Sequence, residues 1–506
     1  MEFFSYAVAA LAPSNLLLAL LGTIIGIIVG ALPGFTPTMG IAVMIPMTYT
    51  MDAGPGLIFL GSIYVGAMYG GAITAILINT PGTSAAAAAA LDGYPMTKKG
   101  RAHEALVEAA TSSFWGGILG VLALMFLAPP LAKFAFNFGP QERFMMAIFG
   151  LTIIASLSAK SILKGLMMGA LGLLLACIGM DPVLGKARFA FGSTFMAGGI
   201  NMIPAVIGLF SLSQVFTTLK NPISRADGKG FGKITSSGIS LKDLCRYPIS
   251  YIRSSVVGII IGIIPGTGGD VSSYLAYQMG KMMSKHPEEY GNGSREGVGC
   301  CQAASSSCTG GTLIPTLTLG VPGNATAAVL LSGLTIHGLT PGYALFTSNQ
   351  STTYPFILAL FIATFLTLFV GLAGAKYFAK VTLIPKEILS GAVLMLSVMG
   401  SYAIRSKPQD VIVMIVFGVV GYILKCYKYD VVPIVLGLIL GPIAEQGLSQ
   451  MLILNKNSLN ASLTSLFGRP ICIVLMLLSA ASIIYPLWTN RKEAKKAKEI
   501  QEVEED

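Results

Sequence analysis

Three long stretches of this chain contain no Asp, Glu, Lys or Arg: Phe3–Met51, Ala53–Leu91 and Gly297–Ala375. A helix crosses the hydrocarbon core of a bilayer with roughly 20 apolar residues, so each stretch is long enough for at least one crossing. Only 11% of the 506 residues are charged, whereas soluble domains carry about 25%. The sequence therefore excludes a soluble fold and predicts an all-α polytopic membrane protein.

Further apolar segments raise the expected number to about ten to twelve transmembrane helices. Beyond residue 110 the predicted spans are Thr111–Leu131, Phe144–Ser158, Gly165–Met180, Met196–Leu219, Pro355–Ala375, Glu387–Ala403, Val411–Leu424, Val431–Leu448 and Ile471–Leu487. No basic residue precedes the first apolar run, which favours an uncleaved first span over a signal peptide. The net charge is +10, and the Lys and Arg residues lie in short loops between apolar segments. This pattern indicates membrane topology and not nucleic-acid binding.

An internal repeat is the most informative pattern in the chain. A first glycine-proline motif recurs 232 residues later, and the Pro-Gly pair of a second segment, I-N-T-P-G-T-S around Pro81, recurs 241 residues later in L-G-V-P-G-N-A around Pro322. The first motif pairs Gly26, Gly30, Pro33 and Gly34 with Gly258, Gly262, Pro265 and Gly266. Two motifs repeated in the same order indicate a duplicated unit.

The basic residues indicate that the two copies enter the membrane from opposite sides. No positive charge precedes the first copy, whereas seven Lys and Arg residues between Lys220 and Arg253 precede the second. Because short cytoplasmic loops collect Lys and Arg, the N-terminus is expected to be periplasmic and the C-terminus cytoplasmic. We therefore predict two inverted-topology repeats, a first half (1–230) and a second half (231–488), followed by a charged cytoplasmic tail (489–506).

The Pro-Gly pairs predict broken or re-entrant helices deep in the membrane. Proline removes a backbone donor and clashes with the preceding turn, while glycine accepts left-handed geometry. Free amides at such a break suit an anion, and free carbonyls suit Na⁺. The residues expected to bind substrate are Pro33, Gly34, Phe35, Thr36, Asn79, Thr80, Pro81, Gly82, Thr83, Ser84, Pro265, Gly266, Thr267, Gly268, Pro322, Gly323, Asn324 and Thr326.

Ion coupling is expected at Asp270, Asn79 and Asn324. A carboxylate within the membrane is costly and therefore a functional candidate, and Asp270 lies four residues after Gly266. Asp92 is closer to the basic loop at Lys98, where an interfacial position is the simpler interpretation. The cysteines and histidines show no metal-ligand spacing, so no metal centre is expected beyond Na⁺ held by backbone carbonyls.

The motifs closely resemble the large membrane subunit of the tripartite tricarboxylate transporter family. The resemblance rests on A-L-P-G-F-T-P-T, G-A-M-Y-G-G-A-I-T-A-I-L-I-N-T-P-G-T and L-D-G-Y-P-M in the first half, and on I-I-P-G-T-G-G-D and L-G-V-P-G-N-A-T-A-A-V-L-L-S-G-L in the second. It implies a bacterial inner-membrane importer of citrate-like di- and tricarboxylates. It also implies two partners, a small membrane subunit of about four helices and a periplasmic solute-binding protein. Coupling to Na⁺ or H⁺ and an elevator-type movement are implied as well, and the absence of a G-x-x-x-x-G-K-[ST] phosphate loop agrees with this.

Two other readings stay open. An intramembrane aspartyl protease pairs two aspartates, and Asp270 with Asp430 would be the pair here, although the G-x-G-D motif is altered to T-G-G-D and the order is reversed. A passive carboxylate channel is compatible with the same broken-helix plan. Transport and not enzymatic catalysis is the favoured interpretation.

Overall fold

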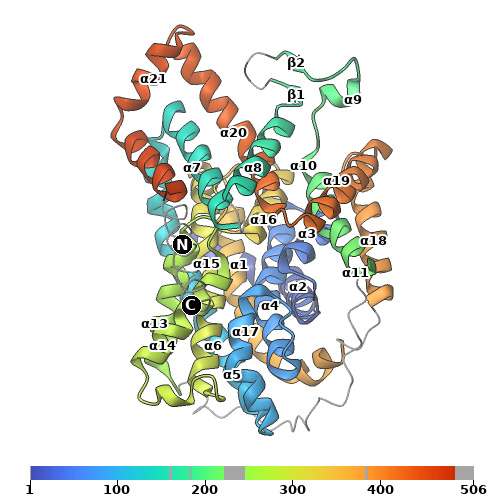
Figure 1. Cartoon of the computed structure of the whole chain (residues 1–506), viewed down its shortest axis with the longest axis vertical. Coiled ribbons are helices and arrows are strands. Elements are labelled where there is room, and N and C mark those ends of the chain that lie inside the picture. The colour runs from blue at the N-terminus through green and yellow to red at the C-terminus, as the bar shows by residue number, and fades with distance from the viewer. Residues whose placement is uncertain are drawn as a thin grey trace, which may run out of the picture. The chain divides into compact units, whose positions relative to one another are not determined.

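The computed structural model describes residues 2–32, 34–158, 162–181, 183, 185–220, 246–381 and 386–484, and these ranges are almost entirely helical (Figure 1). Seven helices within them are long and apolar enough to cross a membrane: Pro13–Ala31, Ala53–Ile78, Ala102–Phe136, Met202–Lys220, Gln350–Gly374, Pro408–Cys426 and Val432–Leu454. A bent pair of helices, Leu459–Phe467 and Pro470–Ile484, meets at 89° and adds an eighth if it is one span. The all-α polytopic fold is confirmed, while the total of ten to twelve crossings stays a prediction.

The described ranges contain these helices and strands in chain order. They are α1 (Glu2–Ala10), α2 (Pro13–Ala31), α3 (Pro37–Thr48), α4 (Ala53–Ile78), η1 (Ser84–Ala86), α5 (Ala87–Lys98), α6 (Ala102–Phe136), α7 (Pro140–Ser158), α8 (Ile162–Ala176), β1 (Gly179–Met180), β2 (Ala187–Arg188), α9 (Thr194–Ala197), α10 (Met202–Ile207), the π-helical η2 (Gly208–Leu212), α11 (Ser213–Lys220), α13 (Pro248–Ile263), α14 (Gly268–Met283), η4 (Pro287–Glu289), α15 (Arg295–Leu319), α16 (Ala325–Ile336), η5 (Tyr343–Phe346), α17 (Gln350–Val381), α18 (Lys386–Ala403), α19 (Pro408–Cys426), α20 (Val432–Leu454) and α21 (Leu459–Phe467).

Two predicted spans are cut short at one end in the structure. The helix expected over Gly165–Met180 ends at Ala176, and β1 and β2 then form a short antiparallel pair. The helix expected to start at Met196 starts at Met202, because α9 ends at Gly198 and Gly199 has a left-handed φ of +76°. Both differences place a glycine turn inside a run that is otherwise apolar.

The chain separates into two compact units: Met1–Phe136 with Ile203–Tyr422, and Asn137–Met202 with Ile423–Asp506. We call the first the core unit and the second the peripheral unit. This division follows packing and not the repeat, so the halves at 1–230 and 231–488 stay a prediction. The charged tail (489–506) lies outside the described residues.

The core unit is built on two equivalent pairs of closely packed helices. On α2, Gly26 and Gly30 face the carbonyls of Ile63 and Ala67 on α4, and on α13, Gly258 faces the Ala304 carbonyl of α15. A methyl group at any of these glycines would collide with the opposite backbone. Small residues that allow such close approach are typical of membrane helix interfaces.

A buried ion pair joins three helices of the core unit. The Arg295 guanidinium Nε donates to a Glu108 carboxylate oxygen at 2.8 Å, and the Tyr251 hydroxyl donates to the other at 2.6 Å. Glu108 is fully buried and Arg295 is 7% exposed. Arg295 and Tyr251 each donate to one of the two carboxylate oxygens of Glu108. This buried cluster therefore links α6, α13 and α15.

The peripheral unit consists of α7, α8, α20 and α21 with the short β1–β2 pair. On α8, Gly172 approaches the Ile434 carbonyl and Gly437 of α20. Arg469 forms an ion pair of 2.9 Å with the buried Glu142. The contacts follow the same plan of small residues and a few paired charges.

Candidate substrate and ion site

The first helix break separates α2 from α3. The Leu32 amide donates to the Val29 carbonyl at 3.2 Å, and the Phe35 amide donates to the Leu32 carbonyl at 3.0 Å. Gly34 has a φ of +88°, which only glycine adopts at little cost. The Thr36 side chain then caps α3. Pro33 itself lies outside the described residues.

The break between α13 and α14 repeats this geometry. The Ile264 amide donates to Ile261 at 3.1 Å and the Thr267 amide donates to Ile264 at 3.4 Å, each 232 residues after its counterpart. Gly266 has a φ of +84°. The Pro265-Gly266 pair therefore ends a helix as the sequence predicts, and α14 starts at once.

The break after α4 is a left-handed helix end followed by a new cap. Asn79 has a φ of +51°, and its amide and that of Thr80 both donate to the Thr74 carbonyl. The Thr83 hydroxyl then accepts from the Ala86 amide at 3.2 Å. The chain thus stops one helix and starts η1 and α5.

The break after α15 matches this one residue by residue. Gly320 has a φ of +71°, and its amide and that of Val321 both donate to the Pro315 carbonyl. The Asn324 side chain accepts from the Ala327 amide at 2.8 Å and caps α16. The four breaks therefore come in two equivalent pairs.

This match shows that the two asparagines do not correspond to each other. Asn79 corresponds to Gly320, since both residues hold the left-handed helix end. Asn324 corresponds to Thr83, since both side chains cap the next helix. Asn79 therefore ends the helix before its break, whereas Asn324 caps the helix after its break.

Within each copy the two breaks touch. Gly82 lies directly against the Gly30 carbonyl, so closely that a methyl group there would collide with it. In the second copy the Gly266 amide donates to the Gly323 carbonyl at 2.7 Å. The glycines of both motifs are therefore required for close approach of one break to the other.

Between the copies the breaks also touch, and the contacts close a ring. The hydroxyls of Thr38 in α3 and Thr326 in α16 are 2.9 Å apart. The start of α14 packs on η1, where Gly269 faces Ala85. We call this set of four breaks, joined one to the next, the break ring.

Tyr64 is a ring residue that the sequence analysis missed. It is fully buried in α4, and its hydroxyl accepts from the Asn324 side-chain amide at 2.8 Å and lies 3.2 Å from the Thr312 hydroxyl. A tyrosine in an apolar run carries no signal for such a role. Its partner Asn324 belongs to the other copy, and only the folded structure brings the two residues together.

Four helix starts belong to the break ring: those of α3, η1–α5, α14 and α16. Helix starts present free amides and the positive end of the helix dipole. The predicted site residues differ in how open they are. Gly34, Thr36, Asn79 and Ser84 are exposed; Thr80, Pro81, Gly266, Thr267 and Asn324 are half-buried; Phe35, Gly82, Thr83, Pro265, Gly268, Pro322, Gly323 and Thr326 are buried.

Asp270 lies in the first turn of α14 and is half-buried. Its carboxylate turns back toward Gly268, where a methyl group would come within 2.8 Å of an oxygen. Among the described residues no group of three or more His, Cys, Asp or Glu side chains could hold a metal ion. A cation at the ring would therefore be held by carbonyls, hydroxyls and this one carboxylate.

Asp92 is held by backbone amides of another segment. It is fully buried in α5, and one carboxylate oxygen accepts from the amides of Gly291, Gly293 and Ser294 at 2.8–2.9 Å. The loop before α15 thereby binds this one oxygen of the carboxylate. Asp430 caps the start of α20 through the Val432 amide at 2.9 Å.

The chain is similar in sequence to one known family and to two proteins of Agrobacterium vitis. The sequence profile of the tripartite tricarboxylate transporter TctA family matches residues 16–436. An uncharacterized 52.8 kDa protein from the TAR-I ttuC′ 3′ region of Agrobacterium vitis is 35% identical over 478 residues, which cover 94% of each chain. A second Agrobacterium vitis protein, from the TAR-II ttuC′ 3′ region, is 31% identical over 227 residues, which cover 44% of this chain and 94% of that one.

Proposed function

Because the chain belongs to the tripartite tricarboxylate transporter TctA family, we propose that it is the large membrane subunit of an ion-coupled importer of di- and tricarboxylates such as citrate. The break ring is the observation that supports a substrate site. It gathers four helix starts and the exposed polar side chains of Thr36, Asn79 and Ser84. Amides and hydroxyls donate hydrogen bonds to carboxylate oxygens, and the helix dipoles favour negative charge.

The charge pattern supports coupling to a cation. The breaks at Pro33, Pro81 and Pro322 lie in the stretches that contain no Lys or Arg. A substrate with two or three negative charges would therefore find no basic side chain from those segments. Helix dipoles offset only part of such a charge, so a co-transported Na⁺ or H⁺ supplies the rest, with Asp270, Asn79 and Asn324 as its proposed ligands.

The transport cycle we propose is alternating access with partners. A periplasmic solute-binding protein delivers the carboxylate, and a small four-helix membrane subunit completes the complex in the bacterial inner membrane. Substrate and ion then favour a conformation open to the cytoplasm, since a ligand shifts such a balance only through different affinities for the two states. An elevator-type slide of inverted repeats is the form of movement that the paired breaks favour.

The two other readings receive less support. A passive channel needs no partner and no ion, and the family match favours a transporter that uses both. For a protease, Asp430 would have to be a free catalytic carboxylate, but it caps the start of α20.

Uptake by vesicles that contain all three components tests the proposal. We expect citrate-like substrates to accumulate only under an imposed Na⁺ or pH gradient, varied separately. Gly266→Leu should abolish uptake, because leucine resists a φ of +84°. Gly100→Leu is the matched control, since Gly100 has a φ of +77° in a loop with open space around it. Equal uptake by Gly266→Leu would contradict the site, and uptake without either gradient would contradict the coupling.

A further inference from the structure

One helix of the break ring is exposed on one face, whereas its counterpart in the other copy is buried there. On α14, Asp270 is half-buried, Tyr274 is 43% exposed and Gln278 is exposed. The equivalent residues of α3 lie 232 positions earlier and are all buried: Thr38, Ala42 and Pro46. The two copies therefore differ in access, although their helix breaks have the same geometry.

The α3 face is covered by other helices of the core unit. The Thr326 hydroxyl of α16 lies 2.9 Å from that of Thr38, and Gly400 of α18 lies directly against the Pro46 ring. The η2 turn also packs on α3. Access to the break ring along this face of α3 is therefore blocked.

The exposed face of α14 differs in chemistry from a surface that meets lipid. The helix α13 lies beside α14 (Figure 1), and its exposed large side chains are aliphatic: Ile249, Ile252, Val256 and Ile260. On α14, Asp270, Tyr274 and Gln278 are four positions apart, so they form one polar line along the helix. Ionisable and polar side chains are costly in lipid and face protein or water-filled cavities. The polar line therefore indicates contact with water.

An open groove of about 470 Å³ lies along this polar line. Val271 and Leu275 of the same helix give the groove an apolar edge. Its volume lies in the range of sites that hold small molecules. Because Asp270 is in the first turn of α14, the groove starts at the break ring itself.

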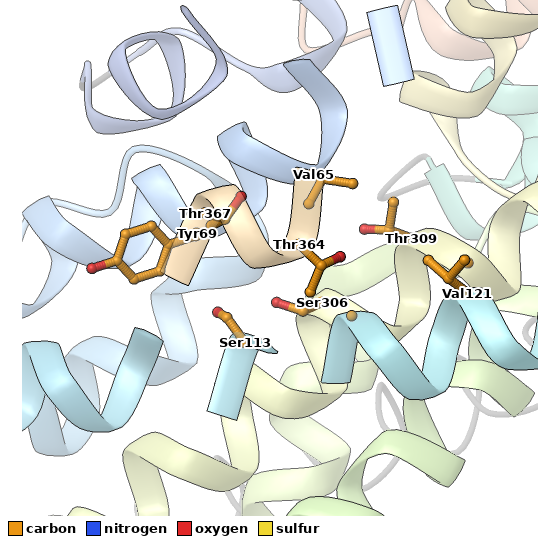
Figure 2. Close-up of a pocket in the computed structure, with 10 residues that line it drawn as sticks. Val65, Tyr69, Ser113, Val121, Ser306, Thr309, Thr364 and Thr367 are labelled. Carbon is orange, nitrogen blue, oxygen red and sulfur yellow. The ribbon is translucent and has the colours of Figure 1, made fainter. Parts of the chain in front are cut away.

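Another pocket of the core unit is too small to carry a solute. It lies between α4, α6, α15 and α17, and Figure 2 shows the side chains of Ser113, Ser306, Thr309 and Thr364 around it. Its volume is about 10 Å³, which is room for one buried water molecule. A solute at the break ring therefore cannot leave through this pocket.

The far end of α14 lies at the end of the core unit that carries the basic loop. The loop that follows α14 binds Asp92 of α5 through its amides, and Lys99 Nζ donates to the Asn292 carbonyl of this loop at 2.6 Å. The positive charges near Lys99 predict that this end is cytoplasmic. The groove therefore leads from the break ring toward the predicted cytoplasmic side.

We propose that the α14 groove is a water-filled path from the break ring to the cytoplasm, and that the structure is an inward-open state of the chain. Tyr274 and Gln278 line this path, and both offer hydrogen-bond donors to an anion. That a carboxylate leaves by this path rests on the proposed function, whereas the access of water to it does not.

Cysteine labelling tests the path. Tyr274→Cys and Gln278→Cys, each in the full chain in sealed vesicles, are treated with a charged, membrane-impermeant thiol reagent on one side at a time. Only a hydrated thiol forms the reactive thiolate, so we expect labelling from the cytoplasmic side at least about tenfold faster than in Ile260→Cys. Ile260 is the matched control, because it is 55% exposed on the aliphatic face of α13. The parent chain, with its seven native cysteines, gives the background.

Three results would overturn the proposal. Labelling of Tyr274→Cys and Gln278→Cys no faster than that of Ile260→Cys would mean that lipid or protein covers the α14 face. Faster labelling of these two variants from the periplasmic side would reverse the direction of the path. Labelling of Ala42→Cys, at the buried α3 equivalent of Tyr274, from the periplasmic side would contradict the inward-open state.

Citrate uptake before and after labelling separates this proposal from the proposed function. The reagent bound at Gln278→Cys should block uptake, whereas the same treatment should leave uptake by Ile260→Cys unchanged. Full uptake by labelled Gln278→Cys would mean that the substrate leaves elsewhere. Cytoplasmic labelling in a complex that takes up no carboxylate under any gradient would support the water-filled path and contradict the proposed function.

Discussion

The hydroxyl oxygens of Thr38 and Thr326 lie 2.9 Å apart in the interior of the core unit, although 288 residues separate them in the sequence. Thr38 is in the first turn of α3 and Thr326 is in the first turn of α16. One belongs to the first copy of the repeat and the other to the second. This hydrogen bond is therefore a direct link between two helix starts of the break ring.

Removal of either hydroxyl should destabilise the core unit. Thr38→Val or Thr326→Val leaves the other buried hydroxyl without its partner, which costs about 1 to 3 kcal/mol. The double variant should cost less than the sum of the two single variants, because both ends of the bond are then gone. Chemical unfolding of the four proteins in detergent measures this coupling. Strictly additive losses would show that the two hydroxyls do not interact.

Asn79 can be tested separately as a backbone residue and as a ligand. Asn79→Ala removes the short polar side chain that lets asparagine adopt left-handed geometry and should cost up to about 1 to 2 kcal/mol. Asn79→Gly keeps the geometry, as Gly320 does in the other copy. If the side chain binds substrate or ion as proposed, Asn79→Gly keeps the unfolding temperature and loses uptake. Full uptake by Asn79→Gly would reduce Asn79 to a conformational role.

The breaks are the part of the site that the sequence predicts well. Proline and glycine act on their own backbone, so Pro265-Gly266 at the end of an apolar helical run predicts where that helix ends. The repeat offset also carries over to hydrogen bonds, as the Asn79 and Gly320 helix ends show. What depends only on local geometry can be read from residue types and spacing.

The contacts between copies cannot be read in this way. Tyr64 meets Asn324 across 260 residues, and no motif marks the tyrosine. Asp92 looks interfacial in the sequence because Lys98 is near, but its partners are backbone amides, which every residue type carries. Tertiary packing decides both cases, and residue spacing contains no information about it.

Tyr64→Phe should loosen the cap of α16. The change removes the hydroxyl that accepts from Asn324 and lies next to Thr312. It leaves a half-buried amide proton unpaired, at about 1 kcal/mol. Tyr69→Phe is the control for stability, because the Tyr69 hydroxyl is buried on the same helix without a partner. Thermal unfolding should show a loss in Tyr64→Phe and none in Tyr69→Phe. Equal losses would mean that ring packing and not the hydrogen bond is responsible.

The glycines that bring paired helices together should respond alike in the two copies. Gly26→Ala and Gly258→Ala each place a methyl group against a carbonyl of the partner helix, so α2–α4 and α13–α15 must separate. Overpacking of this kind costs about 1 to 3 kcal/mol. Gly391→Ala in α18 is the control, since open space surrounds Gly391, and alanine favours the helix by up to about 1 kcal/mol. Unfolding in detergent should rank both repeat variants below the wild type and Gly391→Ala at or above it. A loss confined to one copy would contradict the equivalence of the two helix pairs, because Gly26 and Gly258 both face a carbonyl of the partner helix.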